Sequence, residues 1–473
     1  MGEWPYMLNG VDKFKEECGV FGIYVNEEKT IASSVYYGLF ALQHRGQESA
    51  GIALTTGSDF IVSKDVGLVS DVFDEDFLNI KGIAAIGHVR YSTTGGSRAE
   101  NAQPLFSKYK LGNIAIAHNG NLVNADIVRE LLEDAGVIFQ TTIDTEVVLN
   151  LIARAARKGI ERAVFDAMQA VKGSYSILIL TDDKLIAVRD PHGIRPLCLG
   201  KIDGGYVLSS ESCAFDAIGA EFVRDVEPGE IIIIDKEGIK SFKLVEKTKL
   251  ETCAFEYIYF ARPDSFMDGI SVYESRLRAG EELFKESSVD ADVVIGVPDS
   301  GTFAAVGFSN ASKIPYSIGF IKNKYIGRTF IEPKSQLRER AVSIKLNPLK
   351  TNVEGKRVVL IDDSIVRGTT MRRLIDILRK SGAKEVHVRI ASPKVAYPCY
   401  FGIDTPYRSQ LIGAVKSVEE IGREIGADSL AFLSIEGLLK ALNKESFCLG
   451  CFSGTYPVSA PLEIDKFQFE RNE

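Results

Sequence analysis

Residues 358–370 read Val-Val-Leu-Ile-Asp-Asp-Ser-Ile-Val-Arg-Gly-Thr-Thr, and this run outlines the architecture of the C-terminal half of the chain. Its apolar residues predict a buried strand, and the two acids after them would lie at the carboxyl end of that strand. A loop follows, and then a helix that carries Leu374, Ile377 and Leu378 at helical spacing and stops near Gly382. Open α/β sheets bind their ligands where such a strand ends, so the run predicts both a fold and a site.

Two further apolar runs, at residues 293–297 and 386–390, flank this strand in the sequence. Such runs are typical of parallel strands whose two faces are both covered by helices. The N-terminal half differs, because short strand-like runs such as 177–180 and 231–234 alternate there with amphipathic helical stretches. The clearest of these helical stretches cover residues 125–135 and 145–157. We therefore expect a layered α+β part followed by an α/β part, with a boundary near residues 250–260.

Composition and charge restrict the class of protein. The 473 residues are 45% hydrophobic and 25% charged, which is ordinary for a globular protein and favours two large domains. The net charge of -8 argues against broad nucleic-acid binding. Residues 1–17 contain no apolar run long enough for a signal peptide or a membrane span, so we expect a cytosolic (cytoplasmic) protein without a membrane partner. The seven cysteines are then candidates for thiolate chemistry or metal ligation rather than for disulfides.

Cys18 begins the run Cys-Gly-Val-Phe-Gly-Ile, and alone it would be interpreted as a small buried core residue. Three later runs change this interpretation. Residues 43–47 read Gln-His-Arg-Gly-Gln, residues 87–95 read Gly-His-Val-Arg-Tyr-Ser-Thr-Thr-Gly and residues 118–122 read His-Asn-Gly-Asn-Leu. In this order and spacing they resemble the glutaminase domain of the N-terminal nucleophile amidotransferases.

The resemblance implies that Cys18 is the nucleophile and becomes the first residue when a propeptide, residues 1–17, is cleaved off. Its own α-amino group would then act as the base, and an amine with a pKa near ~8 suits that task. The thiolate would attack the side-chain amide of glutamine, while the Asn119 side chain and the Gly120 N–H stabilise the oxyanion. Outside this context Asn-Gly is more often a tight turn.

Glutamine also presents a carboxylate and an ammonium group, which require a guanidinium and a carboxylate in the site. By the resemblance these are Arg90 and Asp144, although a single Arg–Asp pair is usually a surface ion pair of little consequence. Ile143 departs from the family pattern, where a hydroxyl residue is expected before Asp144. His44 and His118 are not needed as bases beside a free amine, and we interpret both as structural.

The run at 358–370 can bind a phosphorylated sugar. Backbone N–H groups at the start of its helix suit a phosphate monoester, and the two acids can hold ribose hydroxyls and magnesium, although they could also be solvated turn residues. The run resembles the 5-phosphoribosyl-1-pyrophosphate (PRPP) motif of type I phosphoribosyltransferases, and residues 297–301, Val-Pro-Asp-Ser-Gly, resemble their pyrophosphate loop. The PRPP-binding residues implied are Ser300, Asp362, Asp363, Arg367, Gly368, Thr369 and Thr370, and those implied for magnesium are Ser300, Asp362 and Asp363.

Residues 322–345 carry seven Lys or Arg against two Glu, a local excess in a protein of net charge -8. A solvated loop is one explanation. The segment begins Lys-Asn-Lys-Tyr-Ile-Gly-Arg-Thr-Phe, which resembles the lid of the same family. The resemblance implies that Lys324 and Tyr325 help to bind PRPP and that the closed lid excludes water.

Four of the cysteines remain as ligand candidates. Cys448 and Cys451 have the spacing of metal ligands, but such a pair fits zinc, redox chemistry or no function. With Cys253 and Cys399 they resemble the ligand segments of the iron-sulfur subclass of glutamine phosphoribosylpyrophosphate amidotransferases. The implied cofactor is a 4Fe-4S cluster with a structural or oxygen-sensing role, while the spacing alone leaves zinc open. Cys198 and Cys213 match no motif, and we assign both to the core.

These resemblances cover nearly the whole chain after Cys18 and point to that amidotransferase family. They imply an N-terminal-nucleophile αββα sandwich over residues 18–255, a type I phosphoribosyltransferase domain with a mainly parallel sheet over 256–445, and a tail with cluster ligands over 446–473. The implied enzyme transfers glutamine-derived ammonia to PRPP and yields 5-phosphoribosylamine, pyrophosphate and glutamate, the first committed step of purine synthesis. Family membership further implies channelled ammonia, stimulation of glutaminase by PRPP, inhibition by purine nucleotides and a homotetramer.

Two alternatives stay open at the level of sequence. One is an amidotransferase whose partner domain aminates another sugar, as glucosamine-6-phosphate synthase does, although residues 358–370 have no use in a sugar isomerase. The other is a purine-sensing regulator that has kept a phosphoribosyltransferase fold, which the intact Cys18, Arg90, Asn119 and Asp144 disfavour.

Overall fold

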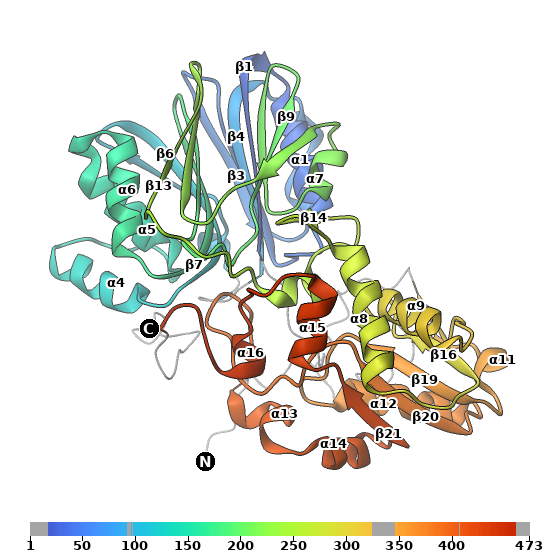
Figure 1. Cartoon of the computed structure of the whole chain (residues 1–473). Helices are drawn as coiled ribbons and strands as arrows, with labels where there is room; N and C mark the ends of the chain where they lie inside the picture. Colours follow the sequence, from blue (N-terminus) through green and yellow to red (C-terminus); the bar gives the residue numbers. More distant parts are fainter. Residues whose placement is uncertain (1–17, 92–95, 97, 324–345, 406, 460–473) are drawn as a thin grey trace, which may run out of the picture.

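The computed structural model describes residues 18–91, 96, 98–323, 346–405 and 407–459. In Figure 1 the N-terminal part forms two upright sheets with helices on their outer sides, and the C-terminal part forms a second body beneath them. This arrangement confirms the expected order, with antiparallel sheets first and a parallel sheet after them.

The two N-terminal sheets are antiparallel and stacked face to face. The first has the strand order β11-β9-β10-β1-β4-β2-β3 and the second β13-β12-β8-β7-β6-β5. Strands of the first sheet are β1 (Gly19–Lys29), β2 (Ser49–Thr55), β3 (Phe60–Val66), β4 (Gly82–Arg90), β9 (Cys198–Ile202), β10 (Gly205–Ser209) and β11 (Glu221–Asp225). Strands of the second are β5 (Leu105–Tyr109), β6 (Gly112–Leu122), β7 (Gly173–Thr181), β8 (Leu185–Arg189), β12 (Glu230–Asp235) and β13 (Gly238–Lys243).

Alternation along the strands makes this a four-layer structure. On β6, Ile114 and Ile116 pack under the helices α5 and α6, while Ala115 and Ala117 face the other sheet. Helix α1 covers the outer side of the first sheet, as Figure 1 shows. The helices are α1 (Ile31–Ala41), α4 (Ala125–Asp134), α5 (Thr145–Ala155) and α6 (Ile160–Ala170). Predicted helices 125–135 and 145–157 and strands 177–180 and 231–234 are therefore confirmed.

The C-terminal body is built on a parallel sheet with the order β16-β19-β20-β21. Val359 and Ile361 of β19 face the core under α8, α9 and α15, whereas Val358 and Leu360 face the core under α12 and α14. The strands are β16 (Val293–Gly296), β19 (Arg357–Asp362), β20 (Glu385–Ile390) and β21 (Ser429–Phe432). The helices are α8 (Val272–Glu286), α9 (Gly301–Ser312), α12 (Thr369–Lys380), α14 (Val418–Ile425) and α15 (Ile435–Leu442).

Predictions for this body agree with the structure except at its edge. Helix α12 ends just before Gly382, whose φ of +90° suits a helix terminus that only glycine adopts readily. Ile377 of that helix packs at the margin of the core, while Leu374 and Leu378 are fully buried. The edge strand β21 was not predicted, because its four residues are only half-buried and form no long apolar run.

Short elements complete the described chain. They are α2 (Val69–Val72), α3 (Glu75–Leu78), α7 (Cys213–Asp216), β14 (Phe266–Met267), β15 (Ile270–Ser271), β17 (Phe320–Lys322), β18 (Leu346–Pro348), α11 (Lys350–Val353), α13 (Ile412–Val415) and α16 (Gly450–Ser453). None of the helices in the described ranges is long and apolar enough to cross a lipid bilayer.

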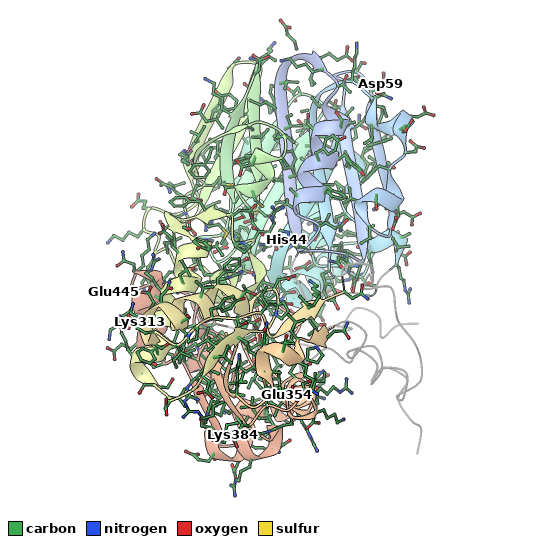
Figure 2. The ribbon with its side chains drawn as sticks, turned by 90° about the vertical axis from the view of Figure 1, so that its right-hand side faces the viewer. His44, Asp59, Lys313, Glu354, Lys384 and Glu445 are labelled. Carbon is green, nitrogen blue, oxygen red and sulfur yellow. The ribbon has the colours of Figure 1, made fainter. Side chains whose placement is uncertain are left out.

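The two bodies meet at a π-helical turn, Glu256–Phe260, where the chain passes from one to the other. Later segments come back to the same junction: Cys448 pairs with Cys253 in a parallel bridge, and α16 lies between the upper sheets and the lower body in Figure 1. Figure 2 places the labelled His44 at this level, at the lower end of the N-terminal layers. The two bodies are therefore joined both by the chain at Glu256–Phe260 and by the returning segment around Cys448.

Helices α8 and α9 cross at van der Waals contact of their backbones. A Cβ on Gly307 would lie 1.9 Å from the carbonyl oxygen of Leu277, too close for any side chain. We expect Gly307→Ala to destabilise the protein by about 2–4 kcal/mol, seen as a lower midpoint of thermal unfolding. The matched control is Gly422→Ala on α14, where the nearest atom to an added Cβ is 3.4 Å away. An unchanged midpoint for Gly307→Ala would contradict the close crossing.

Candidate functional site

Cys18 lies immediately before β1, at the point where β1 pairs with the end of β4. Gly19 is opposite Val89 in this pairing, which places Cys18 beside Arg90 and Tyr91. The thiol donates a hydrogen bond to the Tyr91 carbonyl oxygen at 3.3 Å. The carbonyl oxygen of Cys18 accepts a hydrogen bond from Arg45 Nε at 3.0 Å. Both ends of the residue are thus held by the surrounding strands and loop.

The Cys18 thiol is not a thiolate in this surrounding. It is 7% exposed, and burial raises its pKa to about 11, an effect that the nearby Arg90 charge only partly opposes. Since the thiolate is the nucleophile, attack at neutral pH requires a base that takes this proton.

Asn119 and Gly120 lie on β6, in the sheet opposite Cys18. His88 of β4 forms a 3.0 Å hydrogen bond from Nε2 to the carbonyl oxygen of His118, so the strands that carry Arg90 and Asn119 are joined next to both residues. Asn119 is 1% exposed, and its Nδ2 has no hydrogen-bond partner in the described part of the chain. A buried donor without a partner is costly, so this amide is ready for an acceptor on a ligand.

Gly120 has a φ of +147°, and an added Cβ would lie 2.0 Å from the Ser174 carbonyl oxygen. Only glycine fits such a position, because any side chain would strike the backbone of the neighbouring strand. The Asn-Gly pair is therefore part of a sheet here, and the tight turn considered from the sequence is wrong.

Arg90 and Asp144 are both buried near Cys18. The charges of both act on the Cys18 thiol, so the three groups share one site. Asp144 accepts a hydrogen bond from the Leu122 N–H at 2.9 Å, and its other oxygen lies 3.6 Å from His118 Nδ1. Burial alone would raise the pKa of Asp144, but His118 and these hydrogen bonds hold it below its ordinary value. Asp144 is therefore a carboxylate at neutral pH, as an ammonium-binding residue must be.

The two histidines contact protein groups. His44 bonds the Ala41 carbonyl oxygen through Nδ1 and Glu211 Oε1 through Nε2, at 3.1 and 2.8 Å. His118 Nδ1 lies 3.3 Å from Thr145 Oγ1, and its Nε2 has no partner among the described residues. Their structural role remains a prediction.

A buried ion network links this site to the C-terminal body and was not predicted from the sequence. Arg45 bonds Glu211 at 2.5 Å and Glu256 at 2.7 Å, and Arg195 approaches Glu256 at 3.4 Å. Arg45 was noticed only as a member of the motif at 43–47. Its partners lie more than 160 residues away, and no local pattern reveals such a pairing.

The second site is at the carboxyl end of β19. Asp362 and Asp363 are 2% and 1% exposed, and Ser300 at the start of α9 donates a hydrogen bond to Asp363. Gly301 lets the two segments meet, because an added Cβ would lie 2.6 Å from the Ile361 carbonyl oxygen. The structure thus joins the two runs that the sequence assigned to PRPP and magnesium. Buried carboxylates with a hydroxyl oxygen are a donor set that suits magnesium.

The loop after the acids ends at the amino terminus of α12. Gly368 has a φ of +84°, followed by Thr369 and Thr370 in the first helical turn. Arg367 is exposed, and its Nη2 donates to Gln410 Oε1 at 3.2 Å. Backbone N–H groups in a first helical turn suit a phosphate group. Of the basic segment, Lys322 pairs with Asp299; Lys324, Tyr325 and the rest up to 345 lie outside the described residues.

The four candidate ligand cysteines converge at the junction of the two bodies. The backbones of Cys253 and Cys448 pair in a parallel β-bridge. The Cys451 carbonyl oxygen accepts hydrogen bonds from the N–H groups of Ala396 and Tyr397, which are close to Cys399 in the sequence. The Phe401 N–H donates to Cys399 Sγ at 3.3 Å. Burial raises the pKa of Cys448 to about 12, and burial together with the thiols of Cys399 and Cys448 raises the pKa of Cys451 well above its ordinary value. Cys198 and Cys213 are buried elsewhere, as expected.

Among the described residues, no three His, Cys, Asp or Glu side chains are placed to share one metal ion. The convergence of these cysteines fits zinc or an iron-sulfur cluster.

Comparison with known proteins adds independent observations. A family model for a glutamine amidotransferase domain matches residues 88–217, and one for a phosphoribosyl transferase domain matches residues 272–393. The first range contains Arg90, Asn119 and Asp144, and the second contains Ser300 and Asp362. Cys18 and the four converging cysteines lie outside both ranges, so their roles depend on their own geometry. The second match excludes a sugar isomerase as the partner domain.

Several curated relatives align with nearly the whole chain. Amidophosphoribosyltransferase of Methanocaldococcus jannaschii is 52% identical over 464 residues, which cover 94% of this chain and 98% of that one. The chain belongs to the amidophosphoribosyltransferase family. The Bacillus subtilis amidophosphoribosyltransferase is 50% identical over 459 residues, covering 95% and 96% of the two chains. A solved structure of the B. subtilis glutamine PRPP amidotransferase, complexed with ADP and GMP, superposes with a TM-score of 0.89 at 49% identity and covers 94% and 98% of the two chains.

As an amidophosphoribosyltransferase, the protein is an enzyme of purine biosynthesis with a glutamine amidotransferase domain and a phosphoribosyltransferase domain. This excludes the non-enzymatic regulator that the sequence left open.

The pKa of Cys18 can be read from its reactivity in protein that retains residues 1–17. We expect the rate at which iodoacetamide labels Cys18 to rise about tenfold per pH unit from pH 7 to 10. Burial raises the pKa of this thiol to about 11, so most of it stays protonated over that range. Peptide mapping by mass spectrometry would give the rate for Cys18 alone. In denatured protein the rate should level off near pH 9 instead. A plateau below pH 9 in the folded protein would contradict the buried, protonated thiol.

Proposed function

We propose that this enzyme releases ammonia from glutamine at Cys18 and transfers it to C1 of PRPP held near Asp362 and Asp363. The observation that carries the proposal is the buried Asn119 amide, which has no partner among the described residues and lies on the strand joined to that of Arg90. The same chain has two buried carboxylates, Asp362 and Asp363, at the end of a strand. The products are 5-phosphoribosylamine, pyrophosphate and glutamate.

The glutamine step uses Cys18 and the charged residues near its thiol, Arg90 and Asp144. Arg90 binds the substrate carboxylate and Asp144 its ammonium group. Cys18 Sγ attacks the side-chain amide carbon, and the oxyanion is stabilised by Asn119 Nδ2 and the Gly120 N–H. The C–N bond breaks, ammonia leaves with the thiol proton, and water then hydrolyses the γ-glutamyl thioester to glutamate. Each atom of the amide is thereby accounted for.

Removal of residues 1–17 supplies the base for this step. Among the described residues no carboxylate or imidazole forms a hydrogen bond with the Cys18 thiol, which donates to the Tyr91 carbonyl oxygen. A free α-amino group on Cys18, with an ordinary pKa near ~8, would accept the proton and return it to the leaving amine. The uncut chain is then inactive toward glutamine.

The sugar step depends on positioning and charge. The start of α12, with Arg367, Gly368, Thr369 and Thr370, binds the 5-phosphate, and Asp362 and Asp363 bind the ribose hydroxyls. Magnesium held by Ser300, Asp362 and Asp363 would neutralise the pyrophosphate that leaves. The basic segment with Lys324 and Tyr325 closes over the site, excludes water and opens a passage for ammonia. Glutaminase activity therefore rises when PRPP binds.

Cys253, Cys399, Cys448 and Cys451 would hold a 4Fe-4S cluster, whose chemistry here is to tie chain segments together or to sense oxygen. The convergence of their backbones and the N–H bond to Cys399 Sγ support this assignment. No substrate-binding side chain is proposed beside these cysteines.

Regulation, assembly and location follow the family expectation. The B. subtilis relative was solved in complex with ADP and GMP, which supports inhibition of this enzyme by purine nucleotides. Ile127 and Leu131 of α4 are 59% and 63% exposed and form an apolar strip that a homotetramer could cover. A cytoplasmic location is part of the same proposal.

The two half-reactions should separate by mutation. Cys18→Ala should abolish glutamate release, at least about a thousandfold, and leave 5-phosphoribosylamine formation from added ammonia unchanged. Asp363→Asn should abolish formation of that product with either nitrogen source. Both are measured on anaerobically purified, processed enzyme with magnesium and PRPP. Glutamate release that survives Cys18→Ala, or synthesis that survives Asp363→Asn, would refute the corresponding site.

The metal group is tested without activity. Anaerobically purified protein should contain about four iron and four sulfide per chain and little zinc, with charge-transfer absorption in the visible range, measured by elemental analysis and spectroscopy. Cys451→Ser should lower the iron content, whereas Cys198→Ser, in the buried core, should not. Stoichiometric zinc without sulfide would overturn the assignment.

A further inference from the structure

The segment Tyr400–Gly402, here called the brace, lies against the strands that carry the proposed oxyanion donors. It belongs to the chain after residue 393, beyond the matched phosphoribosyl transferase domain, and is separated from β6 by more than 270 residues. Phe401 is 1% exposed, so the brace is sealed inside the junction of the two bodies.

Three side chains of the N-terminal body donate hydrogen bonds to carbonyl oxygens of the brace. Asn121 Nδ2 donates to Tyr400 at 3.1 Å, and Ser174 Oγ donates to Phe401 at 2.7 Å. Arg195 Nε donates to the same Phe401 oxygen at 2.8 Å. Asn121 is two residues from Asn119 on β6, and Ser174 pairs with Asn121 across to β7.

Gly402, the third residue of the brace, packs close to the backbone of Gly120. Gly402 has a φ of +105°, and an added Cβ would lie 3.2 Å from the Gly120 carbonyl carbon. On its other side Gly120 is packed against the Ser174 carbonyl oxygen, which an added Cβ would approach to 2.0 Å. The backbone of Gly120 is therefore confined between β7 and the brace.

We propose that the brace positions the oxyanion donors of Asn119 and Gly120, so that amide hydrolysis in the N-terminal body depends on a backbone segment of the C-terminal body. Ser174 and Gly402 are positioning residues, since neither touches the substrate. Preorganised donors act only when they are held in place, and losing one completely costs about 10²–10³ in kcat. This inference rests on the proposed roles of Asn119 and Gly120.

Ser174→Ala removes a hydrogen bond to the brace without adding volume. We expect kcat for glutamate release to fall about tenfold, the KM for glutamine to change less than about twofold, and product formation from added ammonia to remain normal. The matched control is Thr181→Val: Thr181 is buried at the far end of the same strand, opposite Ile114, and its hydroxyl group bonds Asp183 and the Lys184 N–H instead. It should leave kcat unchanged.

A double-mutant cycle distinguishes positioning from general damage. In an Asn119→Ala background, Ser174→Ala should cost clearly less than tenfold, because one of the two donors that the brace positions is already gone and only the Gly120 N–H is left. Gly402→Ala, which pushes the brace away from Gly120, should reproduce the kcat loss of Ser174→Ala. Normal ammonia-dependent synthesis shows in each case that the variant is folded.

Wild-type kcat in Ser174→Ala, or a full tenfold loss that persists in the Asn119→Ala background, would overturn the inference. A loss that falls equally on KM and on ammonia-dependent synthesis would also overturn it. The proposed function fails separately, by glutamate release that survives Cys18→Ala or is unaffected by Asn119→Ala.

Discussion

A buried pair of arginines and a buried pair of glutamates hold the two bodies of this enzyme together. Arg45, Arg195, Glu211 and Glu256 are each at most 1% exposed, and their charges are neutralised by one another. Burial alone would raise the pKa of Glu211, but His44 and Arg45 hold it well below its usual range. Removing one member would leave an unpaired buried charge, at a cost of about 3–5 kcal/mol. Such a network fixes which segments meet, whatever its net contribution to stability.

The same network ties Cys18 to the C-terminal body. Arg45 holds the Cys18 carbonyl oxygen at 3.0 Å and Glu256 of the π-helical turn at 2.7 Å, so the proposed nucleophile is two contacts from the start of the C-terminal body. Arg195 joins Glu256 to the Phe401 carbonyl oxygen, which lies beside the strand of Asn119. The proposed nucleophile and the segment beside the proposed oxyanion donors are thus both connected to the Glu256 carboxylate. A shift of the π-helical turn would move both together.

The sequence was sufficient for much of the fold and for the residues that chemistry requires. The run at 358–370 predicted β19 and α12 because an apolar run, two acids and a helix start have a local physical meaning, and Gly382 marked the end for the same reason. The strand β21 was missed because a short, half-buried edge strand has no comparable pattern. The brace could not be predicted at all. Its contacts are made by backbone carbonyl oxygens 279 and 227 residues from their donors, and a carbonyl leaves no trace in the residue type.

The same segment connects the cysteines to the amide chemistry. Cys399 immediately precedes the brace, and its sulfur accepts the Phe401 N–H at 3.3 Å, while the Phe401 carbonyl oxygen accepts from Ser174 and Arg195. Phe401 therefore connects the Cys399 sulfur to Ser174 on β7, the strand that pairs with β6. Under the proposed ligand set, a cluster that fixes Cys399 Sγ also fixes Phe401, whose carbonyl oxygen accepts hydrogen bonds from Ser174 of β7 and from Arg195. The cluster need not touch a substrate to matter for glutamine hydrolysis, because its position alone would keep Gly120 confined.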